Sequence, residues 1–188
     1  SVVALDYFAN TISAALLLFT ILFYVFIYTI WLKRKTPQNI VIGGAAGALP
    51  PVIGWTIATN SISLEPITFF LIIFFWTPSH FWALSLYKSD DYKKAKIPML
   101  PLTNGIESTK INILVYSLLM LPMIILPYAI DLVGLVFLVP ALLLTLYYNL
   151  LCIQLYKCEK NKFNSKKAKT IFGYSILYLF LIFVIFLI

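Results

Sequence analysis

The chain has 188 residues, of which 62% are hydrophobic and 11% are charged, and its formal net charge is +7. A mean hydropathy of +0.95 excludes an ordinary soluble domain and predicts an integral membrane protein. The length suffices for one helical bundle and leaves no room for a second, soluble domain.

Six long apolar runs follow one another along the chain. Each has about twenty residues, enough to cross a hydrocarbon core about 30 Å thick. Lipid cannot hydrogen-bond exposed backbone groups, and the alternating pattern of barrel strands is absent, so these runs are predicted to be helices. We therefore expect an all-α, polytopic membrane helical bundle with spans at Ile12–Leu32, Ile40–Ala58, Ile67–Tyr87, Ile111–Ile130, Leu132–Tyr156 and Ile171–Ile188.

The positions of the charges test this count of spans. All fourteen Lys and Arg residues follow the first, third or fifth run, whereas the other side contains only the acids Asp6, Glu65 and Asp131. The positive-inside rule then places the basic loops in the cytoplasm or its topological equivalent. Topology and anionic lipid account for the net charge, so no nucleic-acid partner is expected.

The loop after the first span has more structure than topology requires. Lys33, Arg34 and Lys35 precede Thr36 and Pro37, which are predicted to cap and begin the second helix. A helix N-terminus beside three cations favours anion binding. An ordinary capped helix with orienting charges explains the same residues equally well.

The second span contains the sequence GGAAGALPPVIGW. Gly43 and Gly47 stand four residues apart, which favours close packing of helices, and the alternative is a substrate that passes against bare backbone. Pro50 and Pro51 are expected to break or kink this helix, because proline lacks an amide donor and clashes with the preceding turn.

The third span leads into Trp76–Pro101, which holds the only histidine of the chain and its only adjacent pair of acids. His80 lies among aromatic residues, and the helical rise puts it about 10 Å below the end of the span at Tyr87. If the helix continues past Tyr87, then Trp76, His80, Tyr87 and Asp91 lie close to one stripe.

Two functional hypotheses follow from this segment. A histidine inside a membrane span is costly, which makes His80 a functional candidate, and the alternative is a core histidine bonded to a neighbouring helix. Asp90 and Asp91 are either a solvated pair balanced by Lys88, Lys93 and Lys94, or carboxylates that hold magnesium together with a diphosphate.

Two blocks of the sequence resemble a known family. YTIWLKRKTPQNIVIGGAAGALPPVIGW and WTPSHFWALSLYKSDDYKKAKIPMLP look like the protohaem IX farnesyltransferases (haem O synthases) of the UbiA-type prenyltransferase superfamily. The resemblance covers the whole chain in order. It implies a bundle of nine helices around a chamber that opens toward lipid, and the six spans here resemble the last six of the nine.

The resemblance also implies a reaction. A farnesyl group would pass from farnesyl diphosphate to a vinyl group of protohaem IX (haem b), with addition of water and release of diphosphate, to give haem O for haem A or for terminal oxidases. Mg²⁺ would be the cofactor, and haem b a substrate. Further partners would be membrane lipid, haem A synthase and terminal oxidase assembly, in a bacterial plasma (inner) membrane or a mitochondrial inner membrane.

The chain departs from the family pattern in several places. The first motif of the superfamily, an Asn and two Asp, is absent, so residues 1–188 are expected to form a single but partial transmembrane prenyltransferase domain, inactive alone. In the second motif, Asp91 matches the acidic position before Tyr92. Pro78-Ser79 replaces the usual Pro-Pro before the histidine.

Carried onto this sequence, the family chemistry assigns a catalytic group comprising Asp91, Asp90, Tyr92 and His80. Asp91 and Asp90 would be the metal ligands, and His80 would either ligate the haem iron or hold a propionate. Cations around the diphosphate and aromatic residues around the chamber would contact the substrates; these are Lys33, Arg34, Lys88, Lys94, Tyr87, Trp76, Phe81 and Trp82.

Three rival functions stay open. A transporter would show internal repeats with paired broken helices, and only one proline-rich break is found. A quinone or chlorophyll prenyltransferase would share the fold. A non-catalytic membrane haem carrier would keep His80 and would have no need of Asp91.

Overall fold

The computed structural model describes residues 1–159 and 165–187, and all regular secondary structure in these ranges is helical. Within these ranges, six segments are long and apolar enough to span a membrane, which confirms the predicted all-α bundle. The elements are α1 Val2–Phe8, α2 Thr11–Leu22, the π-helix η1 Phe23–Leu32, α3 Asn39–Ala48, α4 Pro50–Thr59, α5 Leu64–Tyr87, α6 Ser89–Lys94, α7 Leu100–Thr103, α8 Gly105–Ala129, α9 Leu135–Tyr156 and α10 Ser165–Ile185.

The helix boundaries differ from the predicted spans mainly at the charged end. Helix α8 begins at Gly105 instead of Ile111, and α10 begins at Ser165 instead of Ile171. An apolar run marks only the lipid-embedded part of a helix, and both helices continue with polar turns. The expected break in the second span is confirmed, since α3 ends at Ala48 and α4 begins at Pro50.

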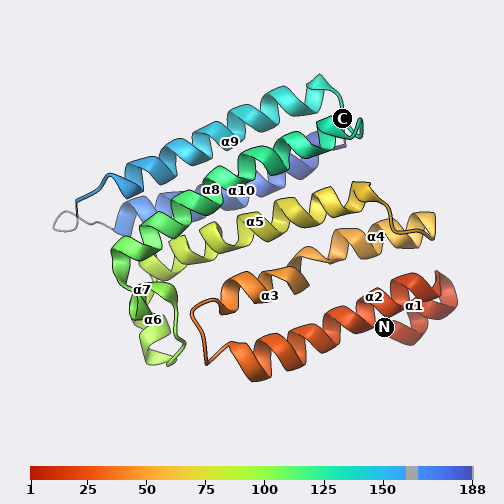
Figure 1. Cartoon of the computed structure of the whole chain (residues 1–188), viewed down its shortest axis with the longest axis horizontal. Helices are drawn as coiled ribbons and strands as arrows, with labels where there is room; N and C mark the ends of the chain where they lie inside the picture. The colour runs from red at the N-terminus through yellow and green to blue at the C-terminus, as the bar shows by residue number, and fades with distance from the viewer. Residues whose placement is uncertain (160–164, 188) are drawn as a thin grey trace.

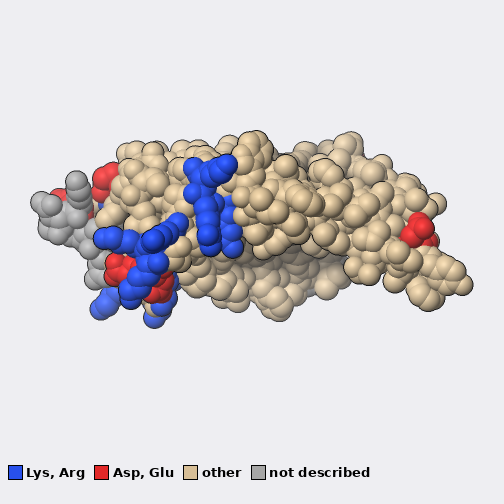
Figure 2. Space-filling model, turned by 90° about the horizontal axis from the view of Figure 1, so that it is seen from below, with Lys and Arg blue, Asp and Glu red and all other residues tan. Residues whose placement is uncertain are grey.

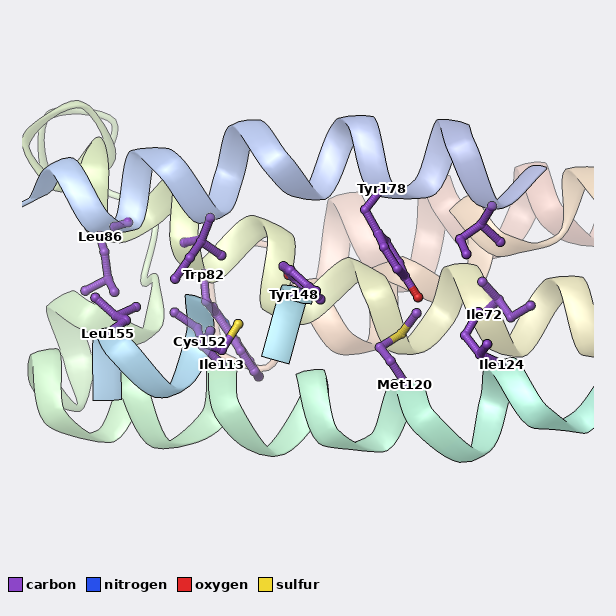
Figure 3. Close-up of a cluster of buried hydrophobic side chains, with 14 of the residues drawn as sticks. Ile72, Trp82, Leu86, Ile113, Met120, Ile124, Tyr148, Cys152, Leu155 and Tyr178 are labelled. Atoms are coloured by element: carbon purple, nitrogen blue, oxygen red, sulfur yellow. The ribbon is translucent and has the colours of Figure 1, made fainter. Parts of the chain in front are cut away.

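Four helices form a densely packed core. Helices α8, α9 and α10 pack on one another or on α5, while α3 and α4 lie on the other side of α5 and α2 lies at the outer edge (Figure 1). Figure 3 shows the labelled core side chains pointing into the space shared by these helices. Members with no exposed surface include Ile72, Trp82, Ile113, Met120, Ile124, Tyr148, Cys152, Leu155 and Tyr178.

Buried hydroxyl groups in this core pair with one another. The Ser79 Oγ and Tyr148 Oη atoms lie 2.8 Å apart, and the Thr145 Oγ1 and Tyr178 Oη atoms lie 3.0 Å apart. Water is absent from a bilayer interior, so such groups need protein partners. These pairs join α5 to α9 and α9 to α10.

The edge formed by α2 and η1 packs more sparsely. Only Ser13 and Ala14 are buried on α2, and no residue of η1 is buried. Its anchor at the uncharged end is polar: the Ser13 and Thr56 hydroxyl oxygens lie 2.8 Å apart, and Asn10 Nδ2 donates to the Thr56 carbonyl at 2.7 Å. A few hydrogen bonds thus replace the extensive packing of the core.

The basic side chains gather at one end of the bundle. On the face visible in Figure 2, Lys and Arg gather toward one end. This is the end where η1, α5 and α9 finish and where α3 and α10 begin (Figure 1). The predicted segregation of basic loops to one end is therefore present in the fold.

Candidate functional site

An apolar cavity of about 500 Å³ lies between the edge helices and α5. Near the charged end it is lined by Tyr28, Ile40 and Phe81, and toward the middle of the bundle by Thr20 and Gly47, as the directions of the helices require. The rest of the lining comes from α2, η1, α3 and α5 and comprises Ile21, Tyr24, Val25, Gly43, Gly44, Ala46, Ile73, Trp76 and Thr77.

The glycines of α3 shape this cavity in different ways. A Cβ atom at Gly43 would overlap the ring of Tyr28, so the glycine lets that ring lie directly against α3. At Gly44 a Cβ would approach Thr77 Cγ2 to 3.1 Å, whereas at Gly47 it would meet nothing within 4 Å. Close packing therefore explains Gly43, while Gly47 presents bare backbone to the cavity.

A second pocket, of about 420 Å³, lies just beyond Tyr28 at the charged end. Lys33 and Arg34 line it from the end of η1, and Ala95 and Ile97 line it from the segment after α6. The Lys33 ammonium lies 5.8 Å from the centroid of the Tyr28 ring. Tyr28 thus lines the apolar cavity, while its neighbours in the chain, Thr29 and Ile30, line the cationic pocket.

The turn that carries these cations is held by Asn39. This buried side chain donates from Nδ2 to the Thr36 carbonyl at 2.7 Å and to the Lys33 carbonyl at 3.3 Å. The helix begins at Asn39, so the predicted start at Pro37 is wrong by two residues. The Thr36 hydroxyl does accept from the Gln38 backbone N–H at 3.2 Å, as a capping residue would.

The predicted stripe along α5 ends at Tyr87. Lys88 leaves helical geometry at φ −114° and ψ 32°, and a new short helix, α6, starts at Ser89 and turns away from α5 (Figure 1). The condition for Asp91 to share the stripe of His80 is therefore not met. Asp90 and Asp91 occupy the first turn of α6, where acidic side chains favour a helix start.

The two aspartates are exposed. Asp91 Oδ2 lies 3.4 Å from Lys88 Nζ, with 62% and 48% of the two side chains exposed. Of the described residues, Asp90 and Asp91 are not in the lining of the cationic pocket, and no three His, Cys, Asp or Glu side chains converge to hold a metal. These carboxylates fit a magnesium ion held mainly by diphosphate oxygens and water, and do not fit one held by protein alone.

His80 lies in an aromatic sandwich between α5 and α10. Its ring stacks on Trp76 at 4.2 Å and on Phe172 at 4.7 Å, and Nδ1 lies 2.6 Å from the Ser175 hydroxyl. The Ser175 hydroxyl donates to the Phe172 carbonyl, so its oxygen accepts from Nδ1–H, and Nε2 keeps the free electron pair of the neutral ring. The bond to a neighbouring helix fits the core interpretation of this histidine.

The aromatic residues assigned to the chamber divide between two places. Trp76 and Phe81 line the apolar cavity, and Trp76 Nε1 also donates to the Ser175 carbonyl at 2.9 Å. Trp82 points the other way: it is fully buried, contacts Tyr116 of α8 edge-on, and does not line this cavity. Of the three aromatic residues expected to line the chamber, Trp82 is thus the one that lies outside this cavity.

The remaining residues that were predicted to act on the substrates lie at the charged end of the bundle. Tyr87 lies under two ammonium groups, those of Lys88 at 5.4 Å and Lys169 at 5.5 Å. Tyr92 is half-buried, burial raises the pKa of its phenol, and it is near enough to Tyr28 for the two phenols to interact electrostatically. Lys94 is exposed at the end of α6.

Sequence reasoning missed Tyr28 and the depth of the cavity beside it. Tyr24 and Tyr28, one turn apart and just before three cations, were the available signal, because aromatic residues favour membrane interfaces. The π-helical form of η1 left no sequence signal; π-helices are rare and frequently mark functional sites.

Comparison with known proteins gives the same picture. The profile of the UbiA prenyltransferase family matches residues 1–177. A Pelagibacter ubique protein named protoheme IX farnesyltransferase is 93% identical over 188 residues, which is 100% of this chain and 62% of that protein. Proteins with the same name from Parvibaculum lavamentivorans and Ehrlichia ruminantium are 50% and 52% identical, over 97% and 93% of this chain and 58% of each relative.

The chain thus spans about 60% of the length of the curated relatives that it matches. No solved structure gave a significant match. The family profile covers nearly the whole chain, and the helical membrane bundle agrees with it. This chain belongs to the UbiA prenyltransferase family.

Proposed function

We propose that this chain forms part of an enzyme that transfers the farnesyl group of farnesyl diphosphate to a vinyl group of haem b. The products would be haem O and diphosphate. The names of the relatives indicate the two substrates, and the chain's membership of a prenyltransferase family indicates the class of reaction.

One observation carries the proposal: the apolar cavity lined by Tyr28 has a cationic pocket next to it, lined by Thr29, Lys33 and Arg34 of the residues that follow. An isoprenoid diphosphate has the complementary form, with a long apolar chain and a compact anionic head. Its chain would lie between η1, α3 and α5, and its head would lie beside Lys33 and Arg34. The bond that must break would then lie near the Tyr28 ring.

The proposed step begins when the bond between the allylic carbon and the diphosphate oxygen breaks. The electron pair leaves with the diphosphate, and Lys33 and Arg34 stabilise that developing charge in a partly dry site. Magnesium, when bound, would neutralise further phosphate charge, with Asp91 and Asp90 as its carboxylate ligands. Lys88 and Lys94, beside these acids, would neutralise the released diphosphate.

The allylic cation then accepts electrons from the haem vinyl group, and a carbon–carbon bond forms. Water adds to the resulting cation and loses a proton, which leaves the hydroxyl group of haem O. Tyr87 and Tyr92 would orient polar groups at the charged end. If His80 contacts haem, its tautomer favours Nε2 ligation of iron, because a propionate needs an N–H donor.

The setting would be a bacterial inner membrane or a mitochondrial inner membrane, with the basic end in the cytoplasm or its equivalent compartment. Membrane lipid would surround the bundle. Haem A synthase or terminal oxidase assembly would receive the product.

The decisive assay expresses the complete gene in a membrane host that lacks its own haem O synthase, followed by extraction of haem. We expect haem O from the unchanged gene and a loss of at least about a hundredfold with Arg34→Ala or Asp91→Ala. Lys157→Ala is the matched control, because Lys157 is an exposed cation at the end of α9.

Other outcomes would reassign the function. A prenylated quinone in place of haem O would keep the family and change the acceptor. Haem that copurifies with the protein and never becomes prenylated would favour a haem carrier. Activity that survives both Arg34→Ala and Asp91→Ala would refute the proposed diphosphate site.

A further inference from the structure

The apolar cavity has two different ends. From Ile40 to Gly47 it follows α3 for about 10 Å, away from the cationic pocket. Thr20 of α2 and Gly47 of α3 line the cavity toward the end farther from the charged end of the bundle, just before the break between α3 and α4, and Gly47 is exposed there. The lining there includes bare backbone, because Gly47 carries no side chain.

We propose that Gly47 determines the length of the isoprenoid that the enzyme accepts. This inference rests on the proposed function, with the diphosphate held at Lys33 and Arg34. With its head fixed there, a longer chain must reach further along α3, and its far end comes to Gly47. The missing side chain provides the space for the last isoprene unit.

The three cavity glycines of α3 are not equivalent in this respect. A side chain at Gly43 would displace Tyr28, and one at Gly44 would press on Thr77, so both would disturb the packing of helices. A side chain at Gly47 has open space around its Cβ position and would occupy the cavity instead. A side chain introduced at Gly47 can therefore shorten the cavity without changing the contacts between helices.

The test offers farnesyl diphosphate and geranyl diphosphate together to membranes that contain the protein expressed from its complete gene, and measures the ratio of the two prenylated haems. We expect Gly47→Leu to shift this ratio toward the shorter geranyl group by about tenfold or more. Gly47→Ala should shift it in the same direction by less. A ratio from competing substrates does not depend on how much protein has folded.

Gly54→Leu is the matched control. Gly54 also lies in the second span, with nothing within 4 Å of its Cβ position, and it does not line the cavity. A ratio that stays unchanged in both Gly47 variants, in membranes where the unchanged protein prenylates haem, would overturn the role of Gly47 and leave the proposed function standing. If the unchanged protein prenylates no haem, the proposed function fails and the inference falls with it.

Discussion

The two sides of α5 differ in how they are built. On one side, α8, α9 and α10 surround side chains with no exposed surface, and hydroxyl pairs such as Ser79 with Tyr148 join the helices. On the other side, η1 has no buried residue and a cavity of about 500 Å³ separates it from α5. Helix α5 therefore packs against the core on one side and lines the cavity on the other.

The difference separates a part of the bundle that side chains fill from a part that leaves room for the proposed substrate. The core helices pack on one another through buried side chains. The edge depends on local devices, such as the Asn10 cap on α2 and the contact of Tyr28 with Gly43. Substitutions should therefore affect stability on one side and substrate binding on the other.

The largest expected effect is on the core side. Trp82→Ala removes a fully buried ring and should lower the free energy of unfolding by about 3–5 kcal/mol. Trp31→Ala, on η1, removes a ring that is 55% exposed and should change stability little. Thermal denaturation of both variants in the same detergent measures the contrast, and equal losses would contradict the division into core and edge.

The edge should respond to a small side chain at Gly43. Gly43→Ala pushes the Tyr28 ring from its place, at a cost of about 1–3 kcal/mol for overpacking. We expect kcat/KM for the isoprenoid diphosphate to fall by about tenfold or more. Gly134→Ala, where a Cβ meets nothing within 4 Å, is the control for a glycine substitution that adds no contact. Normal kinetics for Gly43→Ala would show that the position of Tyr28 is unimportant.

The hydroxyl pairs allow a finer test of the core. In a double-mutant cycle with Ser79→Ala and Tyr148→Phe, the coupling energy should be about 0.6 kcal/mol, the average for hydrogen bonds between membrane helices, and at most about 1.7 kcal/mol. Unfolding in mixed micelles measures it. A coupling near zero would mean that packing alone holds α5 against α9.

The smallest effect on stability should come from Lys88→Ala. Its bond to Asp91 is mostly exposed, and such ion pairs contribute at most about 1 kcal/mol. Activity should fall much more than stability if this end of α5 binds diphosphate. Parallel measurement of the melting temperature and of haem O yield separates the two effects, and a change in stability alone would remove Lys88 from the site.

The sequence predicted the coarse features because they depend on local composition. Apolar runs of sufficient length mark spans, and the segregated lysines and arginines mark one end of the bundle. The break at Pro50 was predictable because proline acts through its own covalent structure. These features need no knowledge of which helix packs on which.

The finer features depend on packing between helices. Trp82 and Phe81 are adjacent aromatic residues on a helix that is apolar all round, so no amphipathic pattern shows that one enters the core and the other lines the cavity. The turn of α6 away from α5 occurs at Lys88, whose backbone angles no sequence pattern here predicts. The cavity arises from contacts between segments far apart in the sequence, such as that of Tyr28 with Gly43.

Lys110 has one expected role during membrane insertion and another in the folded chain. In the folded chain its side chain is fully buried, pairs with Glu107 at 2.8 Å and donates to the carbonyl of Cys158 at the end of α9. That carbonyl partner is in place only after α8 and α9 have packed. While the chain is being inserted, Lys110 acts as one of the cations that keep their loop on the side of the membrane where the basic loops lie. The same ammonium group therefore helps to orient the nascent helix and later fastens it to its neighbour.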